Sequence, residues 1–291
     1  KFHFPLSMIS SAMPSAIDYK AGVSAQLKSA VMLAGLNSFG NTNIIESKKS
    51  RDHTENILLK SPDVIKIKKN NIKIFGKRSL EPLNISVPGD PSSAAFFTFL
   101  ALFNKNSFLK IRNVGLNPRR IGFYKLLKFH GARINFKNIK KINNEVIGDI
   151  YVKYSKIKPI KASAGFYPST ADEYPILFII AALTSGTSIF KGIDDLANKE
   201  SSRAKEMQKI IKQIGISSKL TKSEFKIFGK SKINKIKKII KVTNLGDHRI
   251  CMATSCLSLI TGIKSHINNF ETVNTSSPSY LKIILNLGGR F

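Results

Sequence analysis

Residues 172–190 read DEYPILFIIAALTSGTSIF. Two carboxylates come first, and the apolar run that follows has no polar face. Such a run predicts a helix that is buried on all sides. The glycine after it favours a turn, and the β-branched and aromatic residues beyond favour a strand. The stretch therefore predicts a buried helix, a turn and a strand.

The same pattern occurs three more times. The copies are Ser24–Ile44, Ser92–Ile111 and His248–Ile267, with turns at Gly40, Asn104 to Asn106 and Gly262. A second, amphipathic helix is predicted at Pro118–His130, Ser201–Ile214 and Ser277–Leu287, each ending before a glycine. The copies begin about 70 to 80 residues apart, which is too long for a solenoid. We expect copied βαβ-type modules with helices inside and sheets outside, although helix, glycine and strand alternate in any α/β protein.

The formal net charge of +29 at pH 7 indicates affinity for anions. Nucleic acid, a membrane surface and a phosphorylated metabolite all fit that charge. The lysines gather in residues 64–78 and 226–242, where they alternate with isoleucine as in half-exposed strands. Neither stretch carries the interleaved aromatic residues of a single-strand-binding surface. We interpret these lysines as solvated faces, so the charge alone does not decide the function.

Several kinds of site have no signature in the sequence. There is no Gly-rich phosphate loop, no plausible Ser-His-Asp triad and no metal-ligand spacing. The two cysteines, Cys251 and Cys256, are predicted to be reduced core residues. These observations argue against nucleotide hydrolysis, nicotinamide chemistry and metallohydrolysis.

Polar residues stand where the apolar helices begin. A helix N-terminus presents free N–H groups and positive partial charge, so it attracts phosphate and carboxylate. The residues at three of these openings are Ser24, Ala25 and Gln26 with Lys28, Asp172 with Glu173, and Asp247 to Arg249. If the helices converge, their openings form one anion pocket. The plainer interpretation is that Ser24 and Asp172 are only N-caps.

Two further clusters add cations. Ser50 and Arg51 precede an apolar stretch, where a capping box with solvated charges is the alternative interpretation. Lys199 and Arg203 face the same way if their segment is helical, with Glu200 between them. This second cluster fits phosphate binding together with an acid or base, and an ordinary surface ion-pair set is the alternative.

Together and in order, these segments resemble the 5-enolpyruvylshikimate-3-phosphate (EPSP) synthase family. The matching stretches are SAQLKSAVMLAGL (24–36), SRDHTE (50–55), VPGDPSSAAFF (87–97), VGLNPRRIGFYKLL (114–127), ADEYP (171–175), NKESSRAKEM (198–207) and DHRICM (247–252). The resemblance covers almost the whole chain. It implies an α/β enolpyruvyl transferase fold with two domains of βαβαββ modules. Residues 1–86 would be the last module of an incomplete first domain, and residues 87–291 the second domain.

The resemblance also implies a reaction. The enolpyruvyl group of phosphoenolpyruvate would pass to the 5-hydroxyl of shikimate 3-phosphate by addition and elimination, with phosphate released and no metal or organic cofactor. It further implies a cytoplasmic protein that is a monomer at full length and has no nucleic-acid or membrane partner.

The family pattern implies a role for each matched residue. Asp172 would accept the proton of the attacking hydroxyl, Lys199 would lie beside that hydroxyl, and Glu200 would exchange a proton with the methylene carbon. Shikimate 3-phosphate would be held by Ser24, Ala25, Gln26, Ser50 and Arg51, and phosphoenolpyruvate by Gln26, Arg203 and Arg249.

The chain departs from the family pattern in three ways. The family's N-terminal modules have no counterpart, so we expect the C-terminal two-thirds of an enzyme, which does not work unaided. Ser202 stands where the family has aspartate, and the charge is unusually basic. Three alternatives stay open: a UDP-sugar enolpyruvyl transferase, whose mobile-loop cysteine has no candidate here, a basic nucleic-acid-binding protein, and a non-catalytic remnant.

Overall fold

The structure is a computed structural model that describes residue 7 and residues 9–233, 239–243 and 246–290. The chain divides into two compact units. The first consists of Lys1–Val87 and Lys141–Glu145, and the second of Pro88–Lys140 and Val146–Phe291.

The first unit contains one βαβαββ module. Its elements are β1 (Asp18–Ala21), α1 (Ala25–Asn37), β2 (Asn41–Glu46), α2 (His53–Leu58), β3 (Ile65–Lys68) and β4 (Asn71–Phe75). The strands are ordered β1-β2-β4-β3, with β1 and β2 parallel and the other pairs antiparallel. In β4, Ile72 and Ile74 are buried and Lys73 between them is not, so the alternation predicted for residues 64–78 is confirmed there.

Helix α1 lacks the all-round burial that its apolar sequence predicts. Its buried residues are Lys28, Met32 and Gly35, whereas Leu27 and Leu33 are 60% and 54% exposed. The prediction of complete burial is therefore wrong for α1. An apolar helix is buried only where other elements cover each of its faces, and a single sequence does not report those neighbours.

The second unit contains three more copies of the pattern. The first copy comprises α3 (Pro91–Phe103), β5 (Phe108–Gly115), α4 (Gly122–Phe129), β6 (Arg133–Ile142) and β7 (Glu145–Lys153). The second comprises β8 (Lys161–Ala162), η1 (Ala164–Phe166), α5 (Tyr167–Thr170), α6 (Tyr174–Ala182), β9 (Gly186–Lys191), η2 (Asp194–Asn198), α7 (Arg203–Gln213), β10 (Ser217–Leu220) and β11 (Glu224–Gly229). The third comprises β12 (Ile239–Val242), α8 (His248–Thr261), β13 (Lys264–Ile267), η3 (Phe270–Thr275) and α9 (Tyr280–Asn286).

The sheet topology repeats between copies. The order β8-β9-β11-β10 reproduces β1-β2-β4-β3, again with a parallel first pair and antiparallel partners. In the β5-β7-β6 sheet an isolated parallel bridge between Gly89 and Val114 stands where the first strand would pair. Strands β12 and β13 are also parallel. The predicted α/β fold of repeated βαβαββ-like modules is confirmed.

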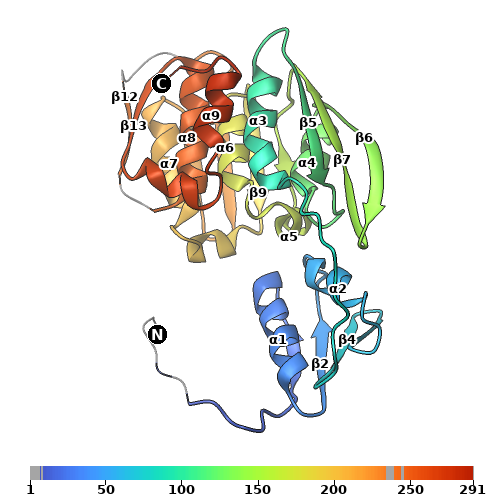
Figure 1. The fold of residues 1–291 in the computed structure, drawn as a ribbon. Helices are drawn as coiled ribbons and strands as arrows, with labels where there is room; N and C mark the ends of the chain where they lie inside the picture. The colour runs from blue at the N-terminus through green and yellow to red at the C-terminus, as the bar shows by residue number, and fades with distance from the viewer. Residues whose placement is uncertain (1–6, 8, 234–238, 244–245, 291) are drawn as a thin grey trace. The chain divides into compact units, whose positions relative to one another are not determined.

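Helices α3, α6 and α8 pack against one another within the second unit. The β5-β7-β6 sheet lies on one side of this group, and β12 and β13 lie on the other (Figure 1). All the residues of α6 are buried, as are most residues of α3. The arrangement with helices inside and sheets outside therefore holds in the second unit, and it brings three helix N-termini toward one place.

The predicted turns and second helices are close to those observed. Gly40, Gly186 and Gly262 all have positive φ, and Gly262 ends α8 in the left-handed conformation. Helices α4, α7 and α9 begin a few residues later than predicted, because the residues at their expected starts lie in turns and caps.

Both cysteines are buried in α8 and are free, as predicted. Burial raises the pKa of Cys251 to about 11 and that of Cys256 to about 12. Within the described residues, no helix combines the length and the apolar character that crossing a membrane requires.

Candidate active site

Three helix N-termini of the second unit carry carboxylates. Asp90 caps α3 by accepting a hydrogen bond from the Ser93 N–H at 2.9 Å. Asp247 caps α8 by accepting one from the Arg249 N–H at 3.1 Å. Glu173 stands at the capping position of α6. The positive partial charge of a helix N-terminus stabilises carboxylates placed in this way.

Asp172, the predicted proton acceptor, lies among three arginines. Its Oδ2 is 3.3 Å from Arg120 Nη1 and 3.6 Å from Arg249 Nη2, and its Oδ1 is 3.8 Å from Arg203 Nη1. The side chain is 17% exposed, so a ligand can reach it. Because Glu173 takes the capping position, the alternative that Asp172 is the N-cap of α6 is wrong. Three guanidinium groups therefore surround the Asp172 carboxylate.

Arg203 is fully buried and is held by two carboxylates. Its Nε donates to Asp247 Oδ2 at 2.9 Å and its Nη2 donates to Glu200 Oε2 at 2.5 Å. Among the described residues its buried Nη1 has no hydrogen-bond partner. A buried donor without a partner is unfavourable by about 1–3 kcal/mol. An anion bound beside Asp172 would satisfy it.

Lys199 and Arg203 do not share a helix, so the condition under which they would face the same way is not met. Lys199 follows η2 with extended backbone (φ −88°, ψ −167°), and α7 begins only at Arg203. The ammonium group of Lys199 forms an ion pair with Asp195 at 2.9 Å. Glu200 lies between Lys199 and Arg203 in the sequence. Its side chain is 46% exposed, and its carboxylate contacts Arg203. The segment is thus a connection between two helices.

Three of the predicted shikimate-phosphate contacts lie at the start of α1, in the first unit. The Oγ of Ser24 accepts a hydrogen bond from the Leu27 N–H at 3.3 Å, so Ser24 is the N-cap of α1. Ala25 and Gln26 are the first two residues of α1, and Gln26 is exposed. Capping occupies one lone pair of the Ser24 hydroxyl and leaves its O–H group available to a ligand.

The other two predicted contacts, Ser50 and Arg51, are tied to α1 through Lys28. The buried ammonium group of Lys28 contacts Glu46 Oε1 at 2.8 Å, Glu55 Oε1, and the carbonyl oxygen of Arg51 at 2.9 Å. Ser50 is buried, and its N–H and hydroxyl both donate to Glu46 Oε1 at 3.2 Å. The first unit therefore places residues 50 and 51 beside the first turns of α1, with Lys28 occupied by carboxylates.

Two acidic groups near Asp172 have pKa values shifted in opposite directions. Burial and the negative charge of Asp172 raise the pKa of Glu173. Burial also acts to raise the pKa of Asp90, but the charge of Arg120 and backbone N–H donors outweigh it and the pKa is lowered. Pairs of carboxyl groups whose pKa values are shifted in opposite directions are typical of acid–base sites.

Arg120 is a site residue that the sequence analysis missed. Its stretch, VGLNPRRIGF (114–123), points to the family resemblance but not to a site residue. The Nη2 of Arg120 donates to Asp90 Oδ1 at 2.6 Å and to Ser92 Oγ at 2.9 Å. A basic pair before an apolar helix was the available signal. This pattern does not identify the carboxylate that Arg120 contacts, because Asp172 lies 52 residues away in the chain.

No group of three or more His, Cys, Asp and Glu side chains is arranged to hold a metal ion in the described part of the chain. The cluster instead offers guanidinium groups, which bind carboxylate and phosphate in bidentate fashion. It therefore suits anionic ligands.

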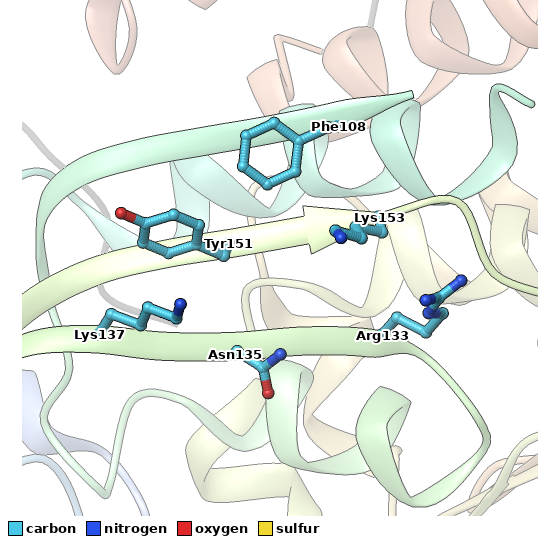
Figure 2. A pocket seen from close by; sticks show the side chains of 6 residues that line it. All are labelled: Phe108, Arg133, Asn135, Lys137, Tyr151 and Lys153. Atoms are coloured by element: carbon cyan, nitrogen blue, oxygen red, sulfur yellow. The ribbon is translucent and has the colours of Figure 1, made fainter. Parts of the chain in front are cut away.

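A separate pocket lies on the β5-β7-β6 sheet (Figure 2). The side chains that line it are Phe108, Arg133, Asn135, Lys137, Tyr151 and Lys153. None of the predicted site residues lines this pocket.

Comparison with known proteins gives consistent matches. The family model for EPSP synthase (3-phosphoshikimate 1-carboxyvinyltransferase) matches residues 8–284. The chain is 39% identical to the 3-phosphoshikimate 1-carboxyvinyltransferase of Petrotoga mobilis and 37% identical to that of Zymomonas mobilis. These matches cover 96% and 94% of the chain but 64% and 62% of the two relatives, so the chain spans less than two-thirds of their length.

Solved structures agree with these matches. EPSP synthase from Acinetobacter baumannii is similar with a TM-score of 0.80 and 34% identity, over 94% of this chain and 63% of that one. The enolpyruvyl transferase NikO from Streptomyces tendae has a TM-score of 0.71 at 12% identity, over 97% of this chain and 66% of that one, a likeness of fold alone. With the family model matching nearly the whole length, the chain belongs to the EPSP synthase family.

Proposed function

We propose that the protein carrying this chain transfers the enolpyruvyl group of phosphoenolpyruvate to the 5-hydroxyl of shikimate 3-phosphate, a step in aromatic amino acid biosynthesis. The observation that carries the proposal is Asp172, a partly exposed carboxylate with Arg120, Arg203 and Arg249 around it. Both substrates are polyanions, and a preformed cationic site holds and orients such molecules before any chemistry.

In the addition step, the hydroxyl oxygen attacks C2 of phosphoenolpyruvate while its proton passes to Asp172. Glu200 donates a proton to the methylene carbon, which becomes a methyl group, and a tetrahedral ketal results. In the elimination step, Glu200 takes a proton back from that methyl group as the C2–O bond to phosphate breaks. The proton held by Asp172 passes to the departing phosphate, so Asp172 is a carboxylate again. The products are the enolpyruvyl ether and inorganic phosphate. The 46% exposure of Glu200 is compatible with this exchange.

The arginines take different parts in this proposal. Arg249 is 14% exposed and would bind phosphoenolpyruvate with its guanidinium fork. Arg203 would contribute its unpartnered Nη1, because its other donors are engaged by Asp247 and Glu200. Lys199, which is paired with Asp195 in the structure, would lie beside the attacking hydroxyl.

The residues of the first unit would bind shikimate 3-phosphate. Ser24 caps α1, Ala25 and Gln26 are its first residues, and N–H groups at a helix start suit a phosphate. Ser50 and Arg51 would supply a further hydroxyl and a guanidinium group. A monomeric state and a cytoplasmic location for the protein are further predictions of this proposal.

The UDP-sugar transferases are the rival within the same fold. Nothing in the described structure favours them, because Cys251 and Cys256 are buried in α8 with raised pKa values. A nucleophilic or redox role needs an accessible thiolate.

The test is acceptor selectivity. The protein carrying this chain, at full length and as residues 1–291 in parallel, is incubated with phosphoenolpyruvate and one acceptor: shikimate 3-phosphate, shikimate or a UDP-sugar. Phosphate release and product mass are measured. We expect phosphate release and an enolpyruvyl ether with shikimate 3-phosphate alone at full length. Transfer to the UDP-sugar, or no transfer to any acceptor, would refute the proposal.

A further inference from the structure

Arg120 joins three segments of the second unit through one guanidinium group. It lies between β5 and α4, and its side chain is 11% exposed. One arm, Nη1, contacts Asp172 Oδ2 at 3.3 Å. The other arm, Nη2, contacts Asp90 at the N-cap of α3 and Ser92 in the first turn of α3. A rigid planar fork can fix such an arrangement, whereas the flexible point charge of a lysine cannot.

The backbone around Arg120 is itself held firmly. Its N–H donates to the Asn117 carbonyl oxygen at 2.8 Å, and the Tyr124 hydroxyl in α4 donates to the Pro91 carbonyl oxygen at 2.6 Å. At Gly122 a Cβ atom would come within 2.1 Å of the Ser169 Oγ. The turn that carries Arg120 is therefore packed against both α3 and the segment leading to Asp172.

A second path leads from the same guanidinium group to the neighbour of Asp172. Ser92 is fully buried, accepts a hydrogen bond from Arg120 and donates one to Glu173 Oε1. Adjacent residues 172 and 173 are thus both tied to Arg120, one directly and one through Ser92. These two attachments restrain the backbone of residues 172 and 173, and with it the position of the Asp172 carboxylate.

We propose that Arg120 is a positioning residue of the transferase, which fixes the Asp172 carboxylate by bridging it to the start of α3. The roles that the family pattern implies for the matched residues do not include one for Arg120. The inference rests on the proposed function for its kinetic consequence, although the positioning itself is a property of the protein alone. Displacement of a catalytic group by about 1 Å lowers rates by about 100-fold.

Three variants separate positioning from simple stability. Arg120→Met removes the fork and keeps the length of the side chain. Asp90→Asn keeps a good N-cap for α3 but removes the charge that anchors Nη2. Arg112→Met is the matched control, since Arg112 is exposed on β5. All are made in the protein carrying this chain at full length, and each is checked for cooperative unfolding.

For Arg120→Met we expect kcat to fall about 100-fold, with KM for both substrates changed less than about threefold. We expect a fall of about tenfold for Asp90→Asn and no change for Arg112→Met. A kcat for Arg120→Met within threefold of the wild type would overturn the inference. So would losses of kcat and substrate affinity that simply follow a loss of folded protein.

A structural readout keeps the inference separate from the proposed function. Crystal structures of the wild type and Arg120→Met are compared for the position of the Asp172 carboxylate. We expect it to move or to adopt more than one rotamer in the variant. An unmoved carboxylate overturns the inference even if the enzyme is active, and a wild type without transferase activity overturns the proposed function but not the positioning.

Discussion

Arg203 and Asp247 form a fully buried ion pair, with Arg203 Nε 2.9 Å from Asp247 Oδ2. The pair joins the start of α7 to the N-cap of α8, and so connects two of the segments that surround Asp172. Breaking one side of such a pair leaves an uncompensated charge in the interior. The site is therefore built on an interaction that also stabilises the fold.

Asp247→Asn should destabilise the protein by about 3–5 kcal/mol, because Arg203 stays charged and loses its main partner. The double variant Asp247→Asn with Arg203→Met should recover much of that loss, since no buried charge remains. The measurement is urea unfolding, with Asp194→Asn at an exposed position as the control. A single variant that loses less than about 1 kcal/mol, the range of exposed pairs, would contradict the account of this pair.

Glu173 should make stability fall as pH rises. Burial and the charge of Asp172 raise its pKa above the ordinary value of 4.5, so the folded state keeps a proton that the unfolded state has lost. Between the pKa of Glu173 in the unfolded state and its higher pKa in the folded state, the free energy of unfolding decreases with increasing pH. Glu173→Gln cannot titrate and should lack this decrease. Urea unfolding of both proteins from pH 4.5 to pH 8 measures the difference, and parallel curves would show that Glu173 is not perturbed.

Asp149 should make the free energy of unfolding fall as pH decreases, in a lower pH range than Glu173. Hydrogen bonds from the Asn113 N–H and the Asn138 amide, with Lys110 nearby, lower its pKa from 3.8 to about 2. Its stabilising contribution is then complete above the unfolded pKa and disappears as pH falls through about 2. Carboxyl NMR titration, assigned with Asp149→Asn, measures this pKa directly. Titration near 3.8 would contradict the observed contacts.

Much of the fold was predictable because it repeats. The apolar runs before Gly186 and Gly262 predict helix, turn and strand, and both turns have the positive φ that favours glycine. The exposure of Leu27 and Leu33 in α1 was not predictable, because periodicity reports the character of a helix and not what covers it.

The candidate site was predictable only in part. A helix opening can be read locally, which is why Asp172 and Arg249 were found. The contacts of Arg120 join residues that are distant in sequence, and a local sequence pattern does not predict such contacts. The four-residue spacing of Lys199 and Arg203 places them on one face only inside a helix, and α7 begins only at Arg203.

The central claim is that Asp172 accepts the proton of the attacking hydroxyl. The most direct test compares Asp172→Asn with Asp194→Asn in the protein carrying this chain at full length, measuring turnover and, separately, equilibrium binding of shikimate 3-phosphate. The account predicts that Asp172→Asn lowers kcat by about 100-fold or more while binding changes little, and that Asp194→Asn alters neither. Wild-type turnover in Asp172→Asn would contradict it.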